Sequence, residues 1–448
     1  MHLMLNVLGV CVRPKCRIMD LRPFDVVDPM THPEGYQRVA LVSEAERIDS
    51  IDVLRGVAVL GILVMNIQLF AMPGAAYFNP TVYGDLEGLN LYVWIVGRMF
   101  ADQKFMTIFS ILFGASIVLI YDRTEARGNA RRIHYRRMVW LLVIGLGHAY
   151  LFWSGDILFL YAVCGMLVYP LRRQPPGRML MFGVVLLAVA SAFSIGMGLS
   201  LPYWSQDARA VFTQEVWQPT EEMIEAELAA YRGGWLAQQP FRSAATLEFQ
   251  TSSLVAWGLW RAGGLMLVGM ALFRYGVLSA ECSQRFYMLL IALAIVIGLP
   301  LVVYGIAINF ERGWPVWSFF IGEQFNYWPS ILVSLGYVGV VMLACQTTTL
   351  QVLTRPLASV GRIALTNYLL QTILCTVFFY GHGLGWFGSV DRIWQVGVVF
   401  VVGMVQLVAS PLWLRRYRFG PAEWAWRSLT YGTLLSLRRQ PSKEGRED

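Results

Sequence analysis

The chain has 448 residues, of which 56% are hydrophobic and only 15% are charged, and its mean hydropathy is +0.51. A soluble globular protein carries about 25% charged residues. This composition therefore excludes a disordered chain, a coiled coil, a collagen-like fibre and a disulfide scaffold, and it argues against an ordinary cytosolic enzyme. The surplus of apolar side chains predicts a multi-pass membrane protein. In that setting the net charge of +7 reports membrane topology, and no nucleic-acid partner is expected.

Ten apolar runs along the chain are long enough to cross about 30 Å of hydrocarbon. They cover residues 53–72, 105–121, 138–154, 157–171, 179–200, 254–273, 286–308, 327–345, 363–380 and 393–414. The run 157–171 is short, so the alternatives there are a span with little tilt and a helix packed inside the bundle. We therefore predict an all-α helix bundle with about ten transmembrane helices. Residues 89–101 are apolar but contain Arg98, which predicts an interfacial or re-entrant helix before the second span. An eleventh crossing is the alternative.

The positions of the cations give this bundle an orientation. If the N-terminus lies inside, the predicted cytosolic segments hold 28 of the 36 Lys and Arg residues, the outer segments hold seven, and Arg261 lies within a span. This is a strong positive-inside bias, so both termini are predicted to be cytosolic. The predicted parts are a cytosolic extension (1–46), a first half of the bundle (47–200), an external loop (201–253), a second half (254–414) and a cytosolic amphipathic helix with its tail (415–448).

The external loop is the one large outer segment. Its middle, PTEEMIEAELAAYR (219–232), begins with the capping residue Thr220 followed by acidic residues, which predicts a short surface helix. Such a helix can cover an outward-facing site or simply decorate the surface. The Trp-rich segment 420–432 is typical of a helix anchored on the cytosolic face. The six cysteines have no metal-ligand spacing, and no metal site is predicted.

Ionisable groups at membrane depth are costly unless they are paired or hydrated, so each is a candidate for function. Asp52 and Arg55 lie at the inner mouth of the first span, where they can form a local ion pair or a ligand site. Lys104 lies where the chain enters the membrane from outside. Its ammonium group can extend to the interface or stabilise a developing negative charge.

His148 and Asp156 flank the turn between the third and fourth predicted spans. An imidazole titrates near neutrality and can act as a general base. Asp156 suits the N-cap of the next helix. It can also orient His148, provided that the chain turns at Ser154 and Gly155. For His148 alone, a hydrogen bond to a neighbouring helix is the plainer interpretation.

Further polar groups recur in other segments. Asn66 interrupts the first helix, and His382 lies at the external end of the ninth. Asn367 and Gln371 share one face of that ninth helix, a pattern typical of hydrogen bonds between helices and also of a polar pathway. The loop 122–137 has six arginines, which suit phosphates or lipid headgroups. They include Arg131, Arg132, Arg136 and Arg137.

Six segments, in this order, resemble the YeiB-like family, also called DUF418. They are RIDSIDVLRGVAVLGILVMNIQLF (47–70), KFMTIFSILFG (104–114), GLGHAYLFWSGDIL (145–158), RAGGLMLVGMALFRYG (261–276), GRIALTNYLLQT (361–372) and FGPAEWAWRSLTYG (419–432). The resemblance implies a protein of the bacterial inner membrane. The family is grouped with membrane acyltransferases, among them the acyltransferase-3 proteins and the heparan-alpha-glucosaminide N-acetyltransferase. The resemblance therefore implies transfer of an acyl group from cytosolic acyl-CoA or acetyl-CoA to a small-molecule or glycan acceptor on the outer side of the membrane.

In the heparan acetyltransferase the important histidine follows the first conserved helix, whereas residues 73–88 here contain none. We therefore predict from position and chemistry that His148 deprotonates the acceptor and that Asp156 orients it. The other candidates divide into oxyanion or acceptor contacts (Lys104, Asn66, His382), CoA contacts (Asp52, Arg55, Arg131, Arg132, Arg136, Arg137) and pathway-lining groups (Asn367, Gln371). The alternatives are a transporter or channel for a small solute or lipid, and a non-catalytic lipid-binding protein. Membrane lipids are expected partners, and a homodimer is a further prediction.

Overall fold

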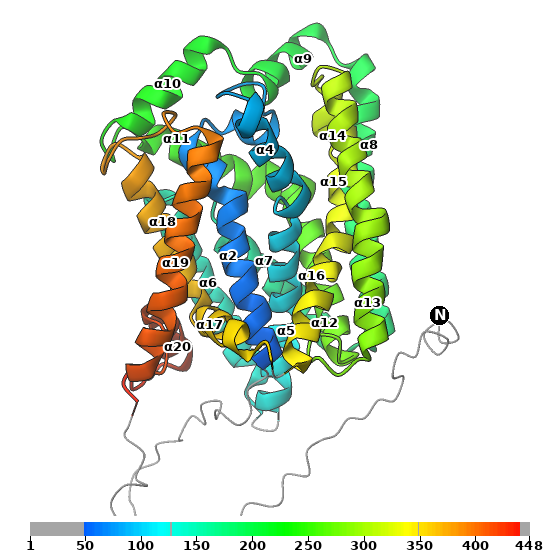
Figure 1. The fold of residues 1–448 in the computed structure, drawn as a ribbon, viewed down its shortest axis with the longest axis vertical. Coiled ribbons are helices and arrows are strands. Elements are labelled where there is room, and N and C mark those ends of the chain that lie inside the picture. Colours follow the sequence, from blue (N-terminus) through cyan, green and yellow to red (C-terminus); the bar gives the residue numbers. More distant parts are fainter. Residues whose placement is uncertain (1–48, 126–127, 348, 440–448) are drawn as a thin grey trace, which may run out of the picture.

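The computed structural model describes residues 49–125, 128–347 and 349–439, and the predicted extension 1–46 lies outside them. The described chain is an all-α bundle (Figure 1). Its α-helices are α2 (Asp49–Ala71), α3 (Ala75–Phe78), α4 (Gly88–Phe100), α5 (Lys104–Glu125), α6 (Ala130–Leu151), α7 (Leu158–Val168), α8 (Pro176–Ser200), α9 (Gln206–Phe212), α10 (Glu221–Arg232), α11 (Gln239–Glu248), α12 (Leu259–Arg274), α13 (Gln284–Leu293), α14 (Leu299–Glu311), α15 (Gln324–Tyr327), α16 (Pro329–Gln346), α17 (Gln351–Arg362), α18 (Ala364–Phe379), α19 (Arg392–Arg416) and α20 (Pro421–Tyr431). Two short 3-10 helices of the described chain are η2 (Tyr169–Arg173) and η3 (Leu201–Tyr203). Four π-helical segments of the same residues are η4 (Thr213–Trp217), η5 (Phe249–Gly258), η6 (Ala294–Gly298) and η7 (Ser318–Gly322).

The protein is a multi-pass membrane protein, and each predicted span coincides with a helical segment of the described chain. By length and composition, seven of these segments can cross a membrane, and the pair α17–α18, bent by 81°, makes an eighth if it counts as one span. The two remaining predicted spans correspond to α6, which opens with a run of cations, and to α7, which has only 11 residues. Helix α4 leads into α5 as one segment, Gly88–Glu125, so no eleventh crossing forms there.

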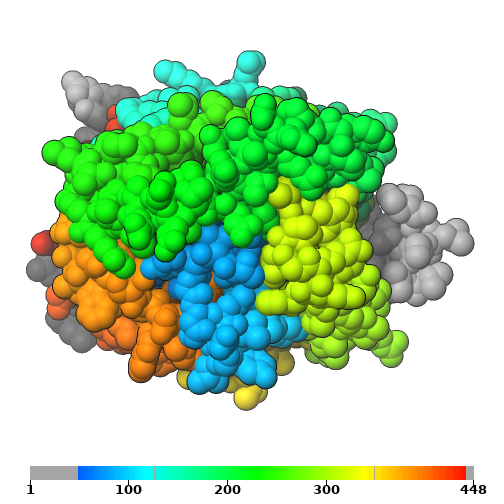
Figure 2. Space-filling model, turned by 90° about the horizontal axis from the view of Figure 1, so that it is seen from above, coloured from blue at the N-terminus to red at the C-terminus, as the bar shows by residue number. Residues whose placement is uncertain are grey.

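The described parts of the segments predicted to be cytosolic gather at one end of the bundle. This end, the lower one in Figure 1, carries the start of α2 together with α17 and α20, and we call it the basic end. The opposite end carries α9, α10 and α11 (Figure 1). Figure 2 looks onto that opposite end and shows the green residues of segment 201–253 spread across it, beside the blue α4 region. The alternating orientation predicted from the cations therefore matches the path of the chain.

The predicted surface helix is α10, and its N-cap is Thr220, whose hydroxyl accepts a hydrogen bond from Met223 N at 3.3 Å. The segment 201–253, predicted to be external, packs on the bundle through hydrogen bonds to the end of α6. Trp235 Nε1 donates to Leu151 O at 2.7 Å, at the outer end of α6. Arg242 Nε donates to Tyr150 O at 3.0 Å in the same turn.

Pairs of glycines allow the central helices to touch through their backbones. A Cβ on Gly56 of α2 would lie 2.0 Å from Leu357 O, and one on Gly361 of α17 would lie 1.9 Å from Asp52 O. Small residues at such crossings are the usual means of close helix packing in membranes. This contact brings the inner mouth of α2 directly against the end of α17, where the chain bends into α18.

Candidate active site

A cavity of about 250 Å³ lies at the basic end, between α2, α5, α6, α7, α17, α18 and α20. Among the described residues, five arginines and two carboxylates line it. They are Arg55, Arg123, Arg137, Arg362 and Arg427, with Asp52 and Glu423. Such an excess of guanidinium groups favours a ligand with several negative charges, since arginine forms paired hydrogen bonds with phosphate oxygens.

The basic mouth of the cavity is held by contacts between neighbouring helices. Arg55 Nη1 lies 2.8 Å from Asp52 Oδ1, so the ion pair predicted on α2 is present. On α6, the guanidinium carbon of Arg137 lies 4.4 Å from the centre of the Trp426 ring. The indole of Trp426 in turn donates to Arg137 O at 2.9 Å. Helix α20, predicted only as an anchor, therefore forms part of the cavity wall.

Glu423 of α20 caps the start of α18. Its Oε1 accepts hydrogen bonds from Leu365 N at 2.6 Å and Thr366 N at 3.2 Å, and its Oε2 accepts from Thr366 Oγ1 at 2.6 Å. Burial raises the pKa of Glu423, and the hydrogen bonds from Thr366 and the backbone oppose that rise. Because the first N–H groups of a helix have no partner within the helix, this carboxylate stabilises the sharp bend beside Arg362.

The inner part of the cavity is aromatic. Phe109 and Phe113 of α5, Tyr161 of α7 and Tyr368 of α18 all line it. The rings of Phe109 and Tyr161 are stacked, with their centres 5.7 Å apart. The lining therefore changes from cationic at the basic end to aromatic further in, which suits a ligand with a charged head and a slender, less polar arm. The small volume, just below the usual range for ligand pockets, also favours a narrow arm.

His148 lies just beyond Tyr368, and the centres of the two rings are 5.3 Å apart. His148 Nδ1 lies 2.8 Å from Asp156 Oδ1, and Nε2 lies 2.9 Å from Thr372 Oγ1. The other oxygen of Asp156 accepts a hydrogen bond from Phe159 N at 2.8 Å. The N-cap of α7 is Ile157, one residue after the predicted position, yet one oxygen of Asp156 still caps an N–H of the first turn of α7 while the other contacts the imidazole. The side chains of His148, Asp156 and Thr372 are all buried.

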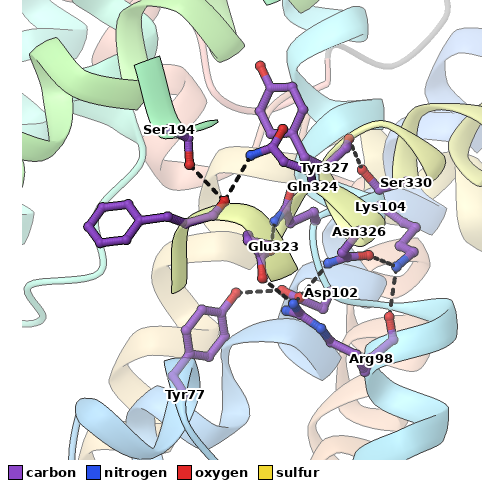
Figure 3. Close-up of polar contacts among 12 residues, drawn as sticks. Tyr77, Arg98, Asp102, Lys104, Ser194, Glu323, Gln324, Asn326, Tyr327 and Ser330 are labelled. Atoms are coloured by element: carbon purple, nitrogen blue, oxygen red, sulfur yellow. Dashed lines mark hydrogen bonds and ion pairs between the residues drawn. The ribbon is translucent and has the colours of Figure 1, made fainter. Parts of the chain in front are cut away.

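The remaining outward candidates do not join this group, and Lys104 has partners of its own (Figure 3). Its Nζ donates to Arg98 O at 2.7 Å and to the side-chain oxygen of Asn326. Asp102 accepts from Tyr77 Oη at 2.6 Å and from Asn326 Nδ2 at 2.8 Å. Within the described residues, Lys104 and His148 share no hydrogen-bond partner.

A chain of ion pairs completes the cluster in Figure 3. Arg98 pairs with both Asp102 and Glu323, and Gln103 donates to Glu323. Gln103 adopts a φ of 60° in the turn between α4 and α5, a conformation that costs free energy for a residue other than glycine. Because the described members bond to one another, we interpret the cluster as a clamp that fixes the α4–α5 turn against segment 318–330.

Among the described residues, neither Asn66 nor His382 forms a hydrogen bond with His148 or Asp156. Asn66 is buried on α2 and forms no side-chain hydrogen bond with any other described residue. His382 lies at the opposite end, where its Nδ1 is 3.3 Å from Gln238 Nε2. Burial and the nearby charge of Arg242 lower the pKa of His382. The oxyanion or acceptor roles of Asn66 and His382 stay predictions.

Asn367 and Gln371 form hydrogen bonds between helices and do not line the cavity. Asn367 Nδ2 donates to Ser410 Oγ at 3.0 Å, and Gln371 Nε2 donates to Gln406 Oε1 at 2.9 Å. These bonds join α18 to α19. Both polar groups are buried and satisfied, which is the arrangement expected of interhelical contacts.

The four predicted arginines of loop 122–137 separate into one that lines the cavity and three that do not. Arg137 lines it. Arg131 and Arg132 are exposed on the first turn of α6. Arg136 Nη2 donates to Leu429 O at 3.0 Å and so holds α20 against α6. The helical periodicity of α6 decides this division, since neighbouring residues point in different directions.

Comparison with known proteins gives the family. The chain is 33% identical over 400 residues to the uncharacterized protein YeiB of Escherichia coli (strain K12), covering 86% of this chain and 96% of that protein. The chain belongs to the YeiB-like DUF418 family. The family model described as "Protein of unknown function (DUF418)" matches residues 272–433. The uncharacterized protein YxaH of Bacillus subtilis (strain 168) is 29% identical over 409 residues, covering 86% of this chain and 94% of that relative. No solved structure matches.

Several residues of the cavity, of the His148 group and of the Lys104 cluster in this YeiB-like chain were not predicted as site residues from the sequence. Tyr368 and Tyr161 are ordinary aromatic residues of apolar helices, so no pattern marked them. Thr372 also carried no signal, because a hydroxyl in a helix usually bonds to its own backbone. Arg98 and Glu323 carried a signal, namely a charge beside or within an apolar run, and that signal predicts a buried ion network.

Proposed function

We propose that this protein transfers an acyl group from acyl-CoA, bound at the basic end, to a hydroxyl or amine that enters from the opposite end of the bundle. One observation carries the proposal. Tyr368 lines the arginine-rich cavity, and the ring of His148, which pairs with the buried Asp156, lies 5.3 Å from the ring of Tyr368. This proximity supports a donor site for a polyanionic carrier next to a general base.

The donor side follows from charge and shape. Coenzyme A has a nucleotide part with several phosphate charges and a slender arm that ends in the acylated sulfur. Arg55 and Arg137 would bind phosphate oxygens at the mouth, and the aromatic part of the lining would enclose the arm. Placing the phosphates at the basic end agrees with a cytosolic source, since that end carries the excess of cations. The bacterial inner membrane is the corresponding location, and the relatives compared are bacterial.

The chemistry of the imidazole follows from its partners. An ionised carboxylate can only accept hydrogen bonds, so Nδ1 of His148 carries the proton that points to Asp156. Nε2 is then free of hydrogen and can accept a proton from a nucleophile as it attacks the thioester carbonyl. The imidazolium that forms is stabilised by Asp156 and returns its proton to the leaving thiolate. The products are the acylated acceptor and free coenzyme A.

The test uses the purified protein in detergent with acetyl-CoA. We expect saturable binding of acetyl-CoA and release of free coenzyme A when an acceptor is present. Arg137→Ala should weaken binding, whereas Arg285→Ala, an exposed cation of α13 outside the cavity, should not. His148→Ala should abolish turnover and leave binding intact. Full turnover by His148→Ala would refute the assignment of the base, and solute flux in vesicles without any acetyl-CoA binding would favour a transporter.

A further inference from the structure

Thr372 is a buried hydroxyl whose partner is unusual for its position. It lies in the middle of α18 and is 1% exposed. Several other buried hydroxyls donate to a nearby backbone carbonyl, as Thr107 does to Gln103 O at 2.7 Å and Thr376 does to Ile373 O at 3.3 Å, and others, such as Thr246, donate to a carbonyl of another helix. Such local bonds are the normal solution for Ser and Thr within a helix. Thr372 instead directs its hydroxyl to His148 Nε2 at 2.9 Å.

This contact completes a series of three groups from three parts of the chain. Asp156 precedes α7, His148 lies on α6 and Thr372 lies on α18. The tautomer that places the Nδ1 proton on the Asp156 side leaves Nε2 as an acceptor, so the Thr372 hydroxyl is the donor in the second bond. A carboxylate, an imidazole and a hydroxyl in this order form the arrangement that activates Ser and Thr as nucleophiles.

The cavity approaches this hydroxyl along α18. Tyr368 lines the cavity and lies one helical turn before Thr372, so the two side chains share a face of the helix. The Tyr368 hydroxyl accepts a hydrogen bond from Ile157 N at 3.4 Å and keeps its own proton for donation. It is therefore a hydrogen-bond donor for a carbonyl oxygen that becomes negative during attack. A rotation of this ring would open the way from the cavity to Thr372.

We propose that Thr372 is a catalytic nucleophile that carries the acyl group between the donor and the acceptor. The inference rests on the proposed acyl-transfer function and adds a covalent intermediate to it. In the first half-reaction, the Thr372 proton moves to His148 Nε2, Oγ1 bonds to the acyl carbon, the carbon–sulfur bond breaks, and the thiolate leaves with that proton. In the second, the acceptor gives its proton to Nε2 and bonds to the acyl carbon, the ester bond to Oγ1 breaks, and Thr372 regains the proton.

The test needs no knowledge of the acceptor. An enzyme with a covalent intermediate exchanges labelled coenzyme A into unlabelled acetyl-CoA when no acceptor is present, and a direct transfer does not. We expect this exchange in the wild type, together with one acetyl group on the peptide that contains Thr372. Thr372→Val keeps the shape of the side chain and should reduce the exchange at least a hundredfold. Thr372→Ser should keep a measurable rate.

Thr376→Val is the matched control, because Thr376 is equally buried one turn further along α18 and its hydroxyl donates to a carbonyl of its own helix. It should exchange at the wild-type rate, and thermal unfolding of both variants separates a chemical effect from a folding defect. A wild type that binds acetyl-CoA but shows no exchange would overturn the inference and leave the proposed function intact. Exchange by Thr372→Val at the wild-type rate, or an acetyl group on His148, would also overturn it. A wild type that binds no acetyl-CoA would instead refute the proposed function itself.

Discussion

Replacing Asp156 by asparagine separates the two roles that this carboxylate combines. One oxygen caps α7 through Phe159 N and the other orients His148, each at 2.8 Å. Asparagine offers one carbonyl oxygen and one amide nitrogen. If the carbonyl keeps the cap, the amide N–H groups face Nδ1, which must then accept a hydrogen bond. The imidazole proton moves to Nε2, and the base is lost.

The expected magnitudes differ for stability and for rate. Asp156→Asn exchanges a charge-assisted hydrogen bond for a neutral one, so we expect a loss of about 1 kcal/mol in the free energy of unfolding. Asp156→Ala removes the cap as well and leaves a buried N–H without a partner, so we expect a loss of about 2–4 kcal/mol. The rate should fall far more in both, by about a hundredfold to ten-thousandfold in the asparagine variant, because the imidazole is held in the wrong tautomer.

The assay compares release of coenzyme A from acetyl-CoA with the midpoint of thermal unfolding, for wild type and both variants. The asparagine variant should be nearly as stable as the wild type and almost inactive. If it instead kept the wild-type rate, with only the alanine variant impaired and in proportion to its lost stability, Asp156 would be a helix cap and nothing more. The reasoning that assigns His148 as an oriented base would then fail.

Three further outcomes follow from packing and charge. Trp426→Ala should lower the affinity for acetyl-CoA, measured by titration, by about two- to thirtyfold, since a cation–π contact contributes about 0.5–2 kcal/mol; unchanged affinity would exclude an ordering role for this ring. Glu423→Ala should cost about 3 kcal/mol in thermal or denaturant unfolding, because three hydrogen bonds to the carboxylate are lost at the start of α18, and Glu423→Gln about 1 kcal/mol; equal losses in the two variants would contradict the cap. Gly269→Ala should destabilise the bundle by about 1–3 kcal/mol, since its Cβ would lie 2.0 Å from a backbone carbonyl oxygen of α5. Gly263→Ala on the same helix, with its nearest atom at 3.7 Å, should be tolerated, and a comparable loss there would refute the argument from close packing.

Several features of the site could be predicted from the chain alone because they depend on local spacing. Asp52 and Arg55 are three residues apart on one helix, and they pair as that spacing predicts. Thr220 caps α10 as its sequence pattern predicts. The contact between His148 and Asp156 required a turn between them, and the turn is present at the start of α7.

Other features depend on contacts between segments far apart in sequence, which no local pattern encodes. Lys104 is predicted as an oxyanion or acceptor contact, and that role stays a prediction. Its hydrogen bond to Asn326, more than 200 residues away in the chain, is not encoded by any local pattern. The role proposed for Thr372 depends on its contact with His148, which lies 224 residues away in the sequence. The sequence does not distinguish the arginines of α6, and the packing of α6 in the bundle places only Arg137 of the four at the cavity, against Trp426 of α20.

The sequence by itself determined that this is a helical membrane protein and which end of each helix is basic, because hydropathy and the placement of Lys and Arg act along the chain. It also restricted the functional candidates to a few groups, because ionisable side chains are costly in hydrocarbon. Only the tertiary structure decided which of those groups meet. Helix crossings as close as that of Gly56 and Gly361 fix the rotation of each helix about its axis, and that rotation determines whether a polar side chain faces a cavity, another helix or lipid.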